Sequence, residues 1–84
     1  MKKVIMFGIE KVTVNGDFIT IYNRKVGQSA QFAVYPDGTL REGDNTYKAS
    51  VKALKKGYAE LVKGRAIAWI HIIRLHLGFM MMVW

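Results

Sequence analysis

The sequence predicts an α+β fold: an antiparallel sheet of two hairpins plus a C-terminal strand, with one amphipathic helix packed on one face. Three observations support this prediction. Short β-rich segments separated by Asn-Gly and Pro-Asp-Gly occupy the first half of the chain. Apolar residues then recur at steps of four and three, which is the period of one helix face. Finally, a chain of 84 residues has room for one small domain, so these elements share one core.

The residue pattern of 9–22 predicts the first hairpin. Asn15-Gly16 separates two β-rich segments, and this dipeptide favours the two positive φ angles of a type I′ turn. That loop would place Val14 opposite Asp17. The two-residue period of a strand puts four aliphatic residues on one face: Val12, Val14, Ile19 and Ile21. The other face then carries a mixed set: Ile9, Lys11, Thr13, Phe18, Thr20 and Tyr22.

A second hairpin is predicted from residue 30 onward. Residues 30–35 form its first strand, because they are β-rich and end at a proline. Pro36-Asp37-Gly38 is typical of a type I turn followed by a glycine in the left-handed region. The polar residues 23–29 are expected to form the loop between the hairpins, so that residues 1–43 make a β-meander.

Residues 45–63 are predicted to form the helix. Its apolar stripe is expected to contain Tyr47, Val51, Leu54, Tyr58 and Leu61. Asp44 and Asn45 are suitable N-caps, and Gly64 is a suitable C-terminal stop. Gly57 costs the helix about 1 kcal/mol relative to alanine. We interpret it as a position where the helix packs closely against a strand.

The residue pattern of 66–84 predicts a strand over 66–77 followed by an apolar tail. The alternative to the strand is an amphipathic helix. A membrane-spanning or membrane-associated helix is opposed by Arg74 near the middle of the segment. The tail either completes the core or forms an interface with a partner or a second copy of the chain. The residues predicted for that interface are Phe79, Met80, Met81, Met82 and Trp84.

The charge of the chain predicts an anionic partner. Thirteen Lys and Arg against six Asp and Glu give a net charge of +7. Most of the excess is expected on one flank of the helix, in Lys48, Lys52, Lys55, Lys56 and Lys63. Five cations of one sign in a narrow arc favour phosphate binding, so nucleic acid is the leading hypothesis. A solvated face that keeps the domain soluble is the alternative.

The mixed face of the first hairpin is a second candidate for nucleic-acid binding. Lys11, Phe18 and Tyr22, with Arg24 and Lys25 in the next loop, combine aromatic planes with positive charge. Single-stranded nucleic acid is bound by this combination of stacking and phosphate contact. The alternative is that Phe18 and Tyr22 are ordinary core or half-buried sheet residues. The sequence does not say which face the helix covers.

The sequence argues against catalysis. It has no cysteine, which removes disulfides and thiolate metal sites and indicates a reducing, cytoplasmic setting. His71 and His76 are five residues apart, so neither a strand nor a helix lets them share a metal ion. We therefore expect no cofactor, no metal and no catalytic residue. The expected function is a small nucleic-acid-binding module. One alternative is an inhibitor or accessory protein, of a kind viruses and mobile elements encode, that docks on an acidic host surface. The other is a membrane-associated protein that contacts the membrane through residues 66–84.

Overall fold

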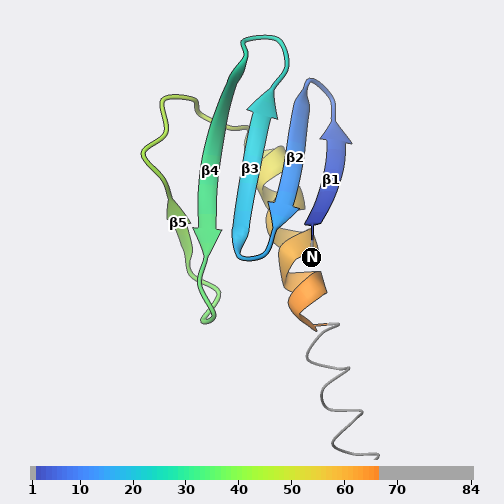
Figure 1. The fold of residues 1–84 in the computed structure, drawn as a ribbon, viewed down its shortest axis with the longest axis vertical. Helices are drawn as coiled ribbons and strands as arrows, with labels where there is room; N and C mark the ends of the chain where they lie inside the picture. The colour runs from blue at the N-terminus through green and yellow to red at the C-terminus, as the bar shows by residue number, and fades with distance from the viewer. Residues whose placement is uncertain (1, 67–84) are drawn as a thin grey trace, which may run out of the picture.

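The structure is a computed structural model that describes residues 2–66, and it confirms the α+β fold. Five strands form one antiparallel sheet in the order of the chain, and a helix packs behind it (Figure 1). The strands are β1 (Lys2–Phe7), β2 (Glu10–Asn15), β3 (Phe18–Asn23), β4 (Gln28–Val34) and β5 (Leu40–Glu42). The helix occupies residues 51–66. Residue 66 is thus helical, and the rest of the strand expected over 66–77 lies outside the described residues.

β1 and β2 form a hairpin that was not predicted. Phe7 pairs with Glu10, so the loop consists of Gly8 and Ile9. Gly8 has a φ of 64° and Ile9 has a negative φ, which is the pattern of a type II′ turn. Glycine accepts this conformation without the steric penalty that a Cβ would bring. The first strand was missed because Gly-Ile is a weaker turn signal than Asn-Gly.

The turn between β2 and β3 differs from the predicted one by one residue. Asn15 pairs with Phe18, so the loop is Gly16-Asp17. Gly16 has a φ of 60°, and no other residue type in 2–66 has a positive φ, so the type I′ prediction is wrong and the turn is type II′. A type II′ turn needs only one positive φ, which glycine supplies.

The wrong turn nevertheless led to the right core. Moving the loop by one residue shifts each pairing by two positions, so Val14 lies opposite Ile19 instead of Asp17. Because side chains alternate with a period of two, a shift of two leaves every side chain on its own face. The four aliphatic residues predicted to share a face are all buried: Val12, Val14, Ile19 and Ile21.

The second half of the sheet agrees more closely with the sequence. β3 and β4 are longer than predicted, which shortens the loop between them to residues 24–27. The predicted type I turn is confirmed: the Gly38 N–H donates to the Tyr35 carbonyl at 2.9 Å, and Gly38 has a φ of 88°. The Asp37 carboxylate supports this turn by accepting a hydrogen bond from the Thr39 N–H at 2.9 Å.

The helix begins at residue 51, six residues later than predicted. Its N-cap is Ser50, whose Oγ accepts a hydrogen bond from the Ala53 N–H at 3.2 Å. Asn45, a predicted N-cap, instead binds β4: its side chain contacts both the Gln31 N–H (2.8 Å) and the Gln31 carbonyl (3.0 Å). These bonds hold Asn45 against β4 in an irregular segment, so the helix starts later in the chain. Gly64 does not end the helix, which continues to residue 66.

The later start changes which helix residues face the sheet. Val51, expected in the apolar stripe, is 64% exposed, and Tyr47 precedes the helix. The buried face instead contains Ala53, Gly57 and Leu61, and Leu54 and Tyr58 are half-buried beside them. The core lies between this face and the sheet and includes Phe32, Val34 and Ala30 from β4.

Gly57 marks the closest approach of the helix to the sheet, as predicted. A Cβ at this position would lie 2.7 Å from Ile19 Cγ2 and 3.0 Å from Val12 Cγ1. Both contacts are with β-branched side chains, which have little freedom to move aside. The helix can therefore lie against β2 and β3 only because residue 57 has no side chain.

A buried polar network holds the start of the helix. Glu10 is 6% exposed, and its carboxylate accepts hydrogen bonds from the Tyr47 hydroxyl (2.8 Å), the Ser50 N–H (3.1 Å) and the Ser50 hydroxyl. Asn23 completes the network by donating to the Tyr47 hydroxyl at 2.9 Å. Burial acts to raise the pKa of Glu10, but the hydrogen bonds from Ser50 and Tyr47 lower it below its ordinary value of 4.5.

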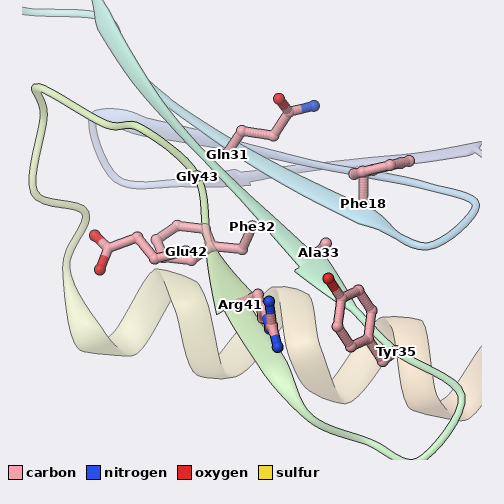
Figure 2. A pocket seen from close by; sticks show the side chains of 8 residues that line it. All are labelled: Phe18, Gln31, Phe32, Ala33, Tyr35, Arg41, Glu42 and Gly43. Atoms are coloured by element: carbon pink, nitrogen blue, oxygen red, sulfur yellow. The ribbon is translucent and has the colours of Figure 1, made fainter.

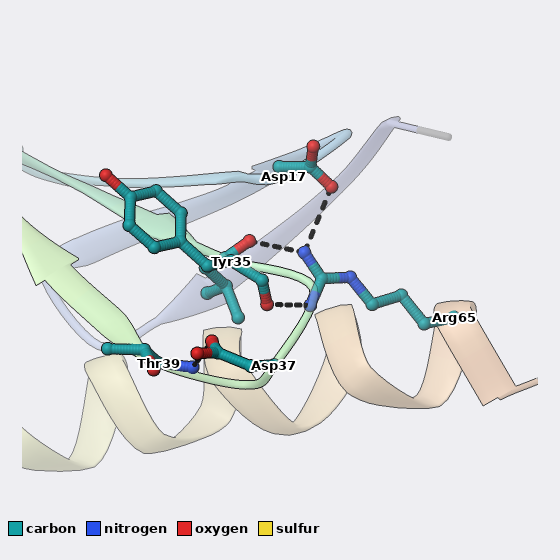
Figure 3. Close-up of polar contacts among 6 residues, drawn as sticks. Asp17, Tyr35, Asp37, Thr39 and Arg65 are labelled. Carbon is teal, nitrogen blue, oxygen red and sulfur yellow. Dashed lines mark hydrogen bonds and ion pairs between the residues drawn. The ribbon is translucent and has the colours of Figure 1, made fainter.

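Arg65 holds the other end of the helix (Figure 3). Its guanidinium donates to the Tyr35 carbonyl at 2.8 Å, to the Asp17 carboxylate at 3.0 Å and to the Val34 carbonyl. Between the two ends, the Tyr58 hydroxyl donates to the Gly38 carbonyl at 2.9 Å. The helix is thus attached by polar contacts along its length to the same face of the sheet.

We predict that Gly57→Ala destabilises the protein even though alanine is the better helix former. The gain in helix propensity of about 1 kcal/mol is outweighed by overpacking of about 1–3 kcal/mol. Denaturant unfolding followed by circular dichroism should show a loss of up to about 2 kcal/mol in the free energy of unfolding. Lys55→Ala, on the exposed side of the same helix, is the control and should change it by less than about 0.5 kcal/mol. A stabilised Gly57→Ala variant would show that the close approach is wrong.

We also predict that protonation of Glu10 lowers the stability of the protein at acidic pH. The pKa of Glu10 is lower in the folded chain than in the unfolded chain. Glu10 therefore makes its full contribution to the free energy of unfolding at a pH above its pKa in the unfolded chain. This contribution is lost as the pH falls through its pKa in the folded chain. Between about pH 5 and about pH 3, the free energy of unfolding should therefore fall more steeply for the wild type than for Glu10→Gln. Other carboxylates titrate equally in both proteins. Identical slopes would contradict the role of Glu10.

Candidate nucleic-acid interface

The sheet has one face that the helix does not cover, which we call the outer face. The helix lies against the opposite side of β2 and β3 (Figure 1). Strand alternation and the observed register place thirteen residues on the outer face. They are Lys2, Val4 and Met6 from β1; Lys11, Thr13 and Asn15 from β2; Phe18, Thr20 and Tyr22 from β3; Ser29, Gln31 and Ala33 from β4; and Arg41 from β5.

The register groups cations and aromatic rings in the same cross-strand rows. One row runs Lys2, Asn15, Phe18, Ala33, Arg41. Another runs Met6, Lys11, Tyr22, Ser29. Residues directly opposite each other in antiparallel strands are close enough for their side chains to interact. Lys11 therefore neighbours Tyr22, and Phe18 lies between the strands that carry Lys2 and Arg41.

The aromatic residues of this face are exposed. Phe18 is 50% exposed, Tyr22 is 39% exposed, and Tyr35, which directly follows β4, is 41% exposed. Phe18 and Tyr22 are therefore not core residues, and the part of the alternative that expected half-buried sheet residues agrees with these exposures. The reason is the placement of the helix on the opposite face, where the aliphatic residues of β2 and β3 lie.

Positive charge gathers on the outer face. Lys2, Lys11 and Arg41 occupy it, and none of the six acidic residues of the chain is at an outer-face strand position. Three acidic residues bind parts of the fold together instead: Glu10, Asp17 and Glu60. Arg41 nevertheless has acidic groups near it, because Glu42 adjoins it in β5 and because Arg41, after the hydrogen bond from Thr39, helps to lower the pKa of Asp37.

The loop next to the outer face contributes less than the sequence predicted. The Arg24 guanidinium donates to the backbone carbonyls of Gly8 and Ile9, and the Arg24 N–H donates to the Ile9 carbonyl at 2.9 Å. Arg24 therefore joins two neighbouring loops of the fold. Lys25 is exposed, and its backbone N–H donates to Asn23 Oδ1 at 2.9 Å.

The five lysines predicted to form an arc do not share one helix. Lys48 precedes the helix, and Lys52, Lys55 and Lys63 are exposed on it. Lys56 pairs with Glu60 at 3.3 Å.

Glu60 further reduces the charge of the helix surface. It pairs with Lys3 of β1 at 2.7 Å as well as with Lys56. The hydrogen bond from Lys3 is the main cause that lowers the pKa of Glu60, and Lys56 adds to it. The helix therefore presents a weaker and more dispersed positive surface than the sequence predicted.

A hollow lies where β4 and β5 meet the outer face (Figure 2). It has a volume of about 210 Å³. Its lining comprises Phe18, Gln31, Phe32, Ala33, Tyr35, Arg41, Glu42 and Gly43. The Arg41 guanidinium carbon lies 5.2 Å from the centre of the Tyr35 ring, a cation–π contact that holds the cation at the hollow. This hollow could not be found from sequence, because it depends on the β4–β5 pairing.

Other expected sites receive no structural account. The proposed interface of Phe79, Met80, Met81, Met82 and Trp84 lies outside the described residues. Within residues 2–66, no three acidic, histidine or cysteine side chains gather to hold a metal ion. In the same part of the chain, no helix is both long and apolar enough to cross a bilayer.

Comparison with known proteins does not identify a relative. No protein family, curated protein or solved structure matches this chain.

The two faces of β3 should respond differently to truncation. We predict that Ile19→Ala lowers the free energy of unfolding by about 2–5 kcal/mol, because it opens a cavity in the core. Phe18→Ala, one residue away on the outer face, should lower it by less than about 1 kcal/mol. Thermal and denaturant unfolding of the two variants provide the measurement. A large loss for Phe18→Ala would show that the outer face is buried by another part of the protein.

Proposed function

We propose that this protein is a small nucleic-acid-binding module that contacts its ligand through the outer face of the sheet. The observation that carries the proposal is the presence of exposed Phe18 and Tyr22 in the same cross-strand rows as Lys2, Lys11 and Arg41. Aromatic rings offer stacking surfaces to bases, and cations offer contacts to phosphates. Single-stranded nucleic acids are bound through both kinds of contact.

A solvated sheet face would have a different composition. Antiparallel sheets that face water on one side typically alternate apolar inward and polar outward residues. Here the outward set includes two exposed aromatic residues, and Val4 and Met6 are 49% and 53% exposed beside them. Such a mixed apolar and cationic surface is typical of an interaction site.

The outer face supports the proposal better than the helix does. On the helix, Glu60 accepts ion pairs from Lys56 and Lys3, and the described helix carries no aromatic residue on its exposed side. The outer face has no acidic strand residue and has both chemical features that nucleic acid needs. We therefore place the primary contact on the sheet and assign the helix lysines a weaker, long-range attraction.

A pair of charge-matched triple variants tests this placement. We predict that Lys2→Glu, Lys11→Glu and Arg41→Glu together weaken binding of a labelled oligonucleotide more than 10-fold in a fluorescence polarisation assay. They should also flatten the dependence of log Kd on log salt, since each lost phosphate contact removes a slope of about 0.7–0.9. The control combines Lys52→Glu, Lys55→Glu and Lys63→Glu, which lowers the net charge of +7 by the same amount.

The outcomes separate the alternatives. A greater loss from the helix variant would place the interface on the helix, contrary to our proposal. Equal losses would indicate attraction by net charge alone, with no defined interface. If the wild type binds neither DNA nor RNA at low salt, the nucleic-acid function is wrong, and an acidic protein surface becomes the partner to test.

A further inference from the structure

The hollow at the β4–β5 side of the outer face combines two features that recognise a planar ring. Phe18 and Tyr35 contribute exposed aromatic surface to its lining, and the Arg41 guanidinium lies over the Tyr35 ring. Figure 2 shows Phe18, Ala33 and Tyr35 beside one another along β3 and β4, with Arg41 facing them from β5. Ala33 lies directly opposite both Phe18 and Arg41 in the register. Its small side chain leaves the space between the larger groups open.

From this arrangement we infer that the hollow binds one unpaired nucleobase, and that the preferred ligand is a single strand. This inference rests on the proposed function and specifies which part of the nucleic acid the hollow recognises, namely an unpaired base. A base has two aromatic faces for stacking, and hydrogen-bond acceptors on its edge. Arg41 supplies only donors, and the Gln31 side chain at the rim supplies both a donor and an acceptor.

The size of the hollow agrees with a single ring system. Its volume of about 210 Å³ lies below the roughly 300–1,000 Å³ of pockets that hold larger ligands. The bases of an intact duplex are stacked inside the double helix, so they cannot enter a hollow between two strands of a sheet. A duplex would meet this face through its phosphates alone, whereas a single strand can place a base in the hollow.

The remainder of the outer face offers a path for the same strand. Tyr22 follows Phe18 by four residues on β3, which corresponds to about 13 Å along the strand. Lys11 lies opposite Tyr22, so a second stacking surface and a phosphate contact are found at that distance from the hollow. A strand that enters the hollow with one base therefore has further contacts within reach.

The test separates contacts to bases from contacts to phosphates. Fluorescence polarisation should compare a labelled single-stranded oligonucleotide with an abasic strand of the same length and with the duplex of the same sequence. We expect the full-length protein to bind the base-bearing strand about 5- to 100-fold more tightly than the abasic strand, the range of one stacked base. We also expect it to favour the single strand over the duplex.

Variants in the hollow should remove this preference selectively. Phe18→Ala and Tyr35→Ala should each reduce the ratio of the two affinities by about 5-fold or more and leave binding of the abasic strand unchanged. Val51→Ala is the control, because Val51 is an exposed apolar residue that lies on the helix, away from the outer face and the hollow. It should leave the ratio unchanged. Far-ultraviolet circular dichroism verifies that all three variants are folded.

The failure of this inference is distinguishable from the failure of the proposed function. If base-bearing and abasic strands bind equally, or if Val51→Ala and Phe18→Ala reduce the ratio alike, the hollow is not a base site although nucleic acid is bound. Tighter binding of the duplex than of the single strand would also overturn the inference. If no strand of any kind binds at low salt, the proposed function itself is wrong.

Discussion

The contact of Gly57 with Ile19 and Val12 is the constraint on which the rest of the structure depends. One helix can cover only one face of a sheet, and it covers the face against which it packs most closely. The absence of a side chain at position 57 lets the helix lie directly on the β-branched residues of β2 and β3. Once this face is buried, the alternation of the strands leaves Phe18 and Tyr22 on the other side. The outer face is thus a direct consequence of the packing of the core.

Polar contacts reinforce that choice of face and also sort the charges. Glu10 at the start of the helix and Asp17 near its other end each bind residues that hold the helix to the sheet. Glu60 joins the helix to β1 through Lys3. With Asp37, which accepts a hydrogen bond from the Thr39 N–H, four of the six acidic side chains are used within the fold, while Lys2, Lys11 and Arg41 lie on a face with no acidic residue at a strand position. Because these acidic side chains bind other residues of the fold, the outer face is more positive than the composition alone indicates.

The proposed interface follows from these two effects together. Burial of the aliphatic face exposes the aromatic residues, and the pairing of acids with the helix leaves the cations of the sheet unopposed. The hollow adds a third element, because it forms only where β5 pairs with β4 and brings Arg41 beside Tyr35. A surface with stacking groups, cations and the hollow is suited to a flexible, negatively charged polymer that carries planar rings.

The sequence predicted those features that depend on local periodicity. The inward positions of Val12, Val14, Ile19 and Ile21 were correct because the two-residue period survives an error of one residue in the turn. The Pro36-Asp37-Gly38 turn was correct because its conformation is set by proline and glycine themselves. The interpretation of Gly57 was also correct, since an interior glycine is costly unless something packs against it.

What the sequence alone determined, then, was the fold class, the grouping of residues by face and the excess of positive charge, because each follows from composition or from contacts near in the chain. The tertiary structure decided the start of the helix, since Asn45 is bound to Gln31 of β4, far away in sequence. It also decided that Lys48 leaves the helix, that Lys3 of β1 pairs with Glu60 and that the aromatic face is the exposed one. These features depend on contacts between distant segments, for which a single sequence carries no local signal.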